Sequence, residues 1–190
     1  MTAHRHNVML PRITAPLFSF LVVALAPVLA LSAPIAKIVT DENGLGCPRS
    51  YPFKEDNLKI VVTEENKTLS EKAICSSYGD AFVAVEKDTK GIYFLLVRYG
   101  QGRGTNARSE FLSIYKLGHN LIEHVRIPIS EPASSTGRWS YDYRISKPTS
   151  GGLLVTLTLR VDEQRDEEFA PADKLRTIEV SSNITRRWSR

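Results

Sequence analysis

The segment whose residue types could most readily do chemistry is residues 100–108, Gly-Gln-Gly-Arg-Gly-Thr-Asn-Ala-Arg. Glycines let a backbone approach a partner closely, and arginine guanidinium groups pair with carboxylates and phosphates. The segment exceeds the roughly two to five residues that a hairpin connection needs. We therefore interpret it as a contact surface for a protein or ligand, and a flexible hairpin tip is the alternative. The candidate binding residues are Gly102, Arg103, Gly104, Asn106 and Arg108.

Established phosphate-binding motifs do not describe this segment. It lacks the third glycine and the following helix of a dinucleotide fingerprint, and no Gly-Lys-Ser/Thr ends it as in a P-loop. Elsewhere, His119 and His124 are isolated from each other and from any cysteine pair, so no zinc site is predicted. No Gly-x-Ser-x-Gly elbow occurs. The sequence thus predicts no catalytic residue, metal or cofactor, although catalytic residues dispersed along the chain would leave no motif.

Aromatic residues alternate along residues 138–146 and place Trp139, Tyr141 and Tyr143 on one face of a predicted strand. Such a stripe more often packs into a core, but it can also stack against sugars or peptides. Both interpretations stay open at this point.

Cys47 and Cys75 are the two cysteines of the chain, 28 residues apart. An even number of cysteines in an exported protein favours a disulfide. The sequence has no Cys-x-x-Cys motif, which would have indicated redox chemistry. We expect a bond that joins the N-terminal segment to the beginning of a strand at residues 81–85.

Residues 1–32 have the pattern of a secretory signal peptide. Arg5 and Arg12 precede an apolar run at 17–31, which leads into small residues. The run is shorter than the roughly 20 residues of a membrane-spanning helix. Cleavage before Leu31 or Ala33 would give a periplasmic or secreted protein without stable membrane association. Without the two leader arginines the formal charge of +4 falls to +2, so no nucleic-acid partner is predicted.

The remaining chain favours an all-β fold. Residues 33–57 are expected to form an irregular lead-in and 58–190 a β domain, with one or two helical turns within 64–73. Pro128 should confine its strand to an edge or an end. About eight short antiparallel strands suggest one sandwich, barrel or curved meander. The expected strands are 58–63, 81–86, 92–99, 110–117, 121–129, 138–146, 153–161 and 174–180.

Together these features favour an exported small binding protein that acts on an unidentified protein partner, in the manner of an inhibitor or immunity protein. The alternatives are a ligand- or glycan-binding β domain that uses the aromatic stripe, and an enzyme with dispersed catalytic residues.

Overall fold

A computed structural model describes residues 32–42, 47, 49–50, 53–54, 56–102, 108–132, 138–161 and 170–182. The signal peptide expected at 1–32 lies outside these residues, apart from Ser32. Two antiparallel sheets and a two-residue ladder make up the described part, together with a 3-10 turn at Ser77–Gly79. Within these ranges, no helix has the length and apolarity that crossing a membrane would require.

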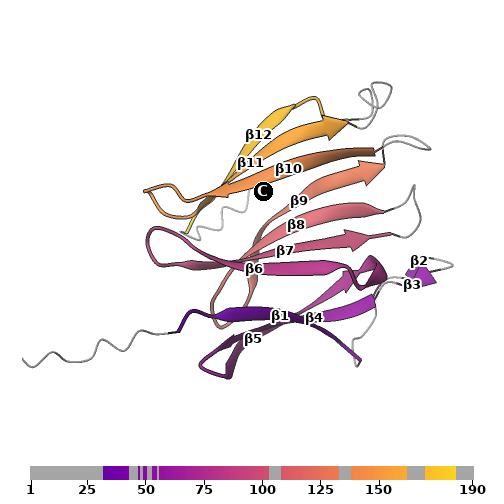
Figure 1. The fold of residues 1–190 in the computed structure, drawn as a ribbon. Coiled ribbons are helices and arrows are strands. Elements are labelled where there is room, and N and C mark those ends of the chain that lie inside the picture. Colours follow the sequence, from indigo (N-terminus) through magenta and orange to yellow (C-terminus); the bar gives the residue numbers. More distant parts are fainter. Residues whose placement is uncertain are drawn as a thin grey trace, which may run out of the picture. The chain divides into compact units, whose positions relative to one another are not determined.

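The larger sheet is a seven-stranded meander in which every strand pairs with its neighbour in sequence (Figure 1). All seven strands were predicted, with ends that differ by a few residues. They are β6 (Ala81–Lys87), β7 (Tyr93–Gln101), β8 (Ser109–Lys116), β9 (Ile122–Pro132), β10 (Arg138–Ser146), β11 (Leu153–Val161) and β12 (Leu175–Val180).

The smaller sheet has the strand order β1-β4-β5 and corrects two predictions. The lead-in at 33–57 is not irregular throughout, because it contains β1 (Ile35–Thr40), the two-residue strands β2 (Arg49–Ser50) and β3 (Phe53–Lys54), and the start of β4 (Asp56–Glu64). The helical turns expected within 64–73 are also wrong, because β5 (Lys67–Ser76) pairs with β4 along its length.

The turn between β4 and β5 explains the second error. Glu65 and Asn66 have φ values of 49° and 64°. Two consecutive left-handed residues are typical of the two-residue turn that matches the twist of a hairpin. The turn aligns Glu64 with Lys67, so strand pairing overrides the helix-forming composition of the segment.

Two apolar clusters occupy opposite faces of the seven-stranded sheet. One packs Leu58, Ile60 and Ile74 of the smaller sheet against Leu95 and Val97 of β7. The other cluster draws its buried members from the larger sheet alone. The Lys116 ammonium group on β8 donates to the Ser182 carbonyl oxygen, just after β12, at 2.7 Å. Because three strands separate β8 from β12 in the sheet, the sheet must curve to bring them together. The buried members of the second cluster are Phe94, Leu96, Leu112, Ile114, Ile127, Ile129, Trp139, Tyr141, Leu153, Val155, Leu157 and Val180.

The alternation predicted for β11 is confirmed by this second cluster. Leu153, Val155 and Leu157 are buried, and Thr158 is exposed. A period of two with one apolar face is what a half-buried antiparallel strand requires.

Asp88 holds the curved sheet together at one end. This buried carboxylate accepts hydrogen bonds from the backbone N–H groups of Lys90 and Ile92 at 2.9 and 2.8 Å, and from Gly152 at 2.7 Å. It thereby joins the β6–β7 turn to the β10–β11 turn. A Cβ atom at Gly152 would lie 2.3 Å from the Val180 carbonyl oxygen, so this close approach requires glycine.

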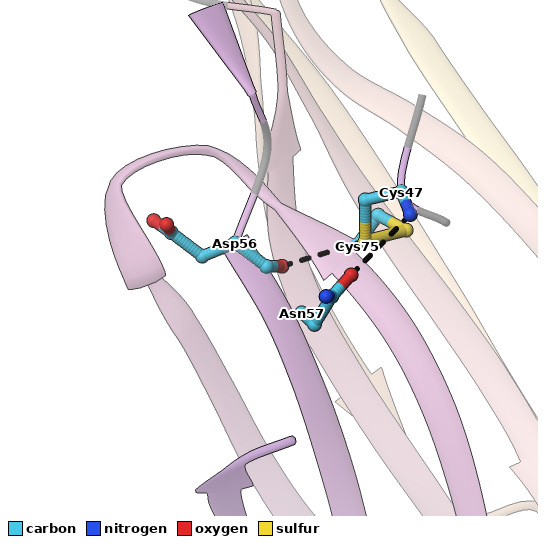
Figure 2. The surroundings of a disulfide bond; sticks show 4 residues. All are labelled: Cys47, Asp56, Asn57 and Cys75. Carbon is cyan, nitrogen blue, oxygen red and sulfur yellow. Dashed lines mark hydrogen bonds between the residues drawn. A yellow bond between two sulfur atoms is a disulfide. The ribbon is translucent and has the colours of Figure 1, made fainter. Parts of the chain in front are cut away.

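The predicted disulfide between Cys47 and Cys75 is present, with a Cα–Cα distance of 5.4 Å (Figure 2). The Cys47 N–H donates to Asn57 Oδ1 at 3.3 Å, and Cys47 Sγ lies 3.7 Å from the Asp56 carbonyl oxygen. The bond therefore fastens the chain before β4 to the end of β5, rather than to the beginning of β6 as expected. A disulfide is compatible with an oxidising extracellular compartment.

Candidate functional site

The segment at 100–108 connects β7 to β8, and the last pair of this ladder is Gln101 with Ser109. Gly102 and Arg108 belong to the described residues, whereas the candidate residues Arg103, Gly104 and Asn106 lie outside them. Gly102 has φ = 79°, a left-handed conformation that favours glycine. The two described ends therefore show how the segment leaves and rejoins the sheet.

The Gly102 end is bound to the 3-10 turn at Ser77–Gly79. The Ser77 hydroxyl donates to the Gly102 carbonyl oxygen. The Gly100 N–H donates to Ser76 Oγ at 3.3 Å, and the Ser76 hydroxyl donates in turn to the Asp80 carbonyl oxygen at 2.7 Å. Ser76 and Ser77 are fully buried. These contacts fix the departure of the segment from β7.

The Arg108 end is bound to the same turn. Arg108 Nη2 lies 3.0 Å from Asp80 Oδ2 and 3.6 Å from Glu110 Oε1, and the guanidinium carbon lies 5.8 Å from the centroid of the Tyr78 ring. Arg138 Nη2 donates to the Arg108 carbonyl oxygen at 2.7 Å. The Arg108 side chain, which is 25% exposed, thus makes intramolecular contacts that position the segment.

Beside this segment, a groove of about 610 Å³ opens where β10 leaves β9. The β9–β10 ladder covers only Arg138–Ser140, whereas β10 stays paired with β11 as far as Ser146. Pro128 lies before the paired end of β9, where the ladder is with β8 alone. β9 is thus an inner strand. Pro128 has no N–H group to donate to a neighbouring strand, but no residue of β10 pairs with it. The groove is lined by Arg98, Glu110, Ile129, Ser130, Arg138, Ser140, Tyr141, Asp142 and Tyr143.

Ion pairs and hydrogen bonds order the charged groups of the groove. Arg98 donates to Glu110 Oε2 through Nη2 at 2.6 Å and through Nε at 3.1 Å. Arg138 donates to Ser130 Oγ at 2.8 Å. Two guanidinium groups, two carboxylates and several hydroxyl groups therefore share one partly open surface, an arrangement suited to contact with a polar partner.

The aromatic stripe is mainly part of the core. Trp139 is 4% and Tyr141 6% exposed, and their rings meet edge to face with centroids 5.7 Å apart. The Tyr141 hydroxyl donates to the Asp173 carbonyl oxygen at 3.1 Å. Only Tyr143, at 37%, reaches solvent appreciably among the three. The stripe offers at most one ring for stacking, which resolves the ambiguity of the sequence.

His124 packs beside an aromatic residue of the core. It lies at an irregularity in the β8–β9 ladder, half-buried, with its ring centroid 6.1 Å from that of Phe94. Burial and the nearby charge of Lys116 lower the pKa of His124. His119 is exposed, and the described residues contain no group of three or more His, Cys, Asp or Glu side chains that could hold a metal ion.

Comparison with known proteins gives no relative, because no family model, curated protein or solved structure matches the chain.

Proposed function

We propose that this is an exported binding protein, of the inhibitor or immunity type, that docks on a protein partner through residues 100–108 and the adjoining groove. The observation that carries the proposal is the anchoring of Gly102 and Arg108 on the turn at Ser77–Gly79. An anchored base fixes where the connection leaves the sheet, and pre-organisation of this kind reduces the entropy lost on binding.

The length of the connection supports the same proposal. Gln101 and Ser109 are already paired, so Gly102 and Arg108 alone could close a two-residue hairpin. Gly102 has the positive φ that the first central residue of such a turn needs. Residues 103–107 are therefore more than closure requires, and they include Arg103, a residue type enriched at protein interfaces.

Export rests on two observations of different kinds. The basic and apolar pattern of residues 1–32 predicts a signal peptide. The disulfide between Cys47 and Cys75 suits an oxidising compartment. The glycan-binding alternative loses most of its basis, because Trp139 and Tyr141 are buried.

The proposal is tested by capture from the exported proteins of the native host with the immobilised, disulfide-bonded protein. Arg103→Glu should weaken binding of the captured partner at least about tenfold, or about 1.4 kcal/mol. Deletion of residues 103–107 should abolish binding. Both variants should keep the wild-type fold, checked by circular dichroism and thermal unfolding.

The matched control is Arg144→Glu, the same charge reversal at an exposed position of β10. It should leave the affinity unchanged. The proposal fails if the deletion variant still binds the same partner with the wild-type affinity, or if both charge reversals weaken binding equally.

A further inference from the structure

A second cavity, of about 330 Å³, lies on the other face of the seven-stranded sheet, beside β5 and the disulfide. Because successive side chains of a strand point to opposite faces, Tyr99 of β7 lines this cavity while Arg98 lines the groove. The cavity is lined by Asp41, Cys47, Asn57, Leu58, Lys72, Ala73, Ile74, Cys75, Tyr99, Gln101, Tyr115 and Glu123.

A buried tyrosine hydrogen-bonded to a carboxylate lines the cavity. Tyr115 is 3% exposed, and its hydroxyl donates to Glu123 Oε1 at 3.3 Å. Burial and the negative charge of Glu123 raise the pKa of Tyr115 well above its usual value. A carboxylate accepts several hydrogen bonds through its two oxygens, so Tyr115 orients Glu123 and leaves it the capacity to accept another donor.

The charged lining has an excess of negative charge. Asp41 and Glu123 contribute two carboxylates, and Lys72 contributes one ammonium group. Arg126 does not line the cavity. Its guanidinium carbon lies 4.0 Å from the Phe111 ring centroid, and its Nη2 donates to Gln101 Oε1 at 2.6 Å.

Apolar groups make up the rest of the wall. Leu58 and Ile74 are buried members of the core between the two sheets, and both cysteines of the disulfide also line the cavity. The volume is near the lower end of the roughly 300–1,000 Å³ of small-molecule sites. The cavity therefore suits a small ligand with an apolar body and a positively charged end.

We propose that this cavity binds a small organic amine, with the ammonium group on the carboxylates of Glu123 and Asp41 and the apolar body against Leu58, Ile74 and the Tyr99 ring. This site differs from the proposed docking surface, because its lining lies mainly on the opposite face of the sheet, and Gln101 is the one described residue that belongs to both.

Three probes of similar size and different charge test the proposal: 2-phenylethylamine, 2-phenylethanol and 3-phenylpropionate. Titration of the disulfide-bonded protein is followed by the methyl NMR signals of Leu58 and Ile74. The amine should bind at least about tenfold more tightly than the alcohol, and the carboxylate should bind most weakly. Preference for the carboxylate, equal binding of all three probes, or no binding of the amine would overturn the proposal.

Glu123→Gln removes the charge and keeps an oxygen that can accept from Tyr115. It should weaken amine binding about tenfold and leave alcohol binding unchanged. Glu179→Gln, which removes an exposed carboxylate on β12, should change neither. If Glu123→Gln leaves the preference for the amine intact, Glu123 does not bind the ammonium group and the proposal is wrong.

Discussion

Substitution of Asp88 by Asn should destabilise the protein through the loss of one specific hydrogen bond. The carboxylate accepts from Lys90 and Ile92 through Oδ1, and from Gly152 through Oδ2. An asparagine can keep the first two contacts, but its NH₂ group then faces the buried Gly152 N–H, and two donors cannot pair.

The expected magnitude follows from the two parts of this change. The lost hydrogen bond to a charged acceptor is worth about 1.5–3 kcal/mol, and the unsatisfied buried N–H costs about 1–3 kcal/mol. We therefore expect the free energy of unfolding to fall by about 3–5 kcal/mol at pH 7. Urea unfolding of both proteins, followed by tryptophan fluorescence, measures this difference.

The same substitution predicts a pH dependence with a definite sign. Burial by itself would raise the pKa of Asp88, but the N–H donors of Gly152, Ile92 and Lys90 outweigh it, and the pKa lies below its ordinary value of 3.8. Stability from a depressed carboxyl pKa is present above the unfolded-state value and is lost as pH falls through the folded-state value. The difference between wild type and Asp88→Asn should therefore be constant above about pH 5 and narrow in more acidic solution.

Glu179→Gln serves as the control, because Glu179 is exposed, and its effect on unfolding should stay within about 0.5 kcal/mol. Equal stability of wild type and Asp88→Asn at pH 7 would refute the assigned role of the Gly152 contact. A difference that stays constant down to pH 2 would refute the pKa argument.

Two further substitutions test the core and the disulfide. Leu157→Ala should lower the free energy of unfolding by about 2–5 kcal/mol in urea unfolding, whereas Thr158→Ala, on the opposite face of β11, should change it by about 0.5 kcal/mol or less; equal effects would contradict the assigned faces. The double variant Cys47→Ser/Cys75→Ser should have a free energy of unfolding lower by about 3–4 kcal/mol, mainly because a closed loop spanning 28 residues no longer restricts the unfolded chain. An unchanged thermal midpoint would contradict this stabilisation by the disulfide.

The candidate binding segment shows how far sequence reasoning reached at the site. Its glycines and arginines marked residues 100–108 as unusual, and Gly102 does need a positive φ. The sequence suggested that Arg108 was available to bind an anion. In the structure its partners Asp80 and Tyr78 come from the turn before β6. The local sequence does not predict that these residues contact Arg108. The proposal that this segment binds a partner stays a prediction.

No pattern in the sequence predicted the groove or the cavity. The groove forms because β10 leaves β9 after Ser140, and the cavity forms between β5 and the larger sheet. Tyr115 and Glu123 pair across two neighbouring strands that the sequence predicts. Lys72 lies on β5, which the sequence does not predict, and only the folded protein brings β5 beside the larger sheet. The alternation of apolar and polar residues along a strand predicts on which face of its sheet each side chain lies. It does not predict which other sheet packs against that face.

By itself, the sequence determined the local structure of this protein: an all-β chain, the strands of the larger sheet, the buried face of β11 and the pairing of its two cysteines. These follow from side-chain alternation and from a cysteine count of two. Tertiary structure alone decided that β5 is a strand, that Trp139 and Tyr141 are core, and that Asp88 joins two distant turns. Strand pairing and close packing join residues far apart in the chain, and their energies can outweigh the weak local preferences that a sequence displays.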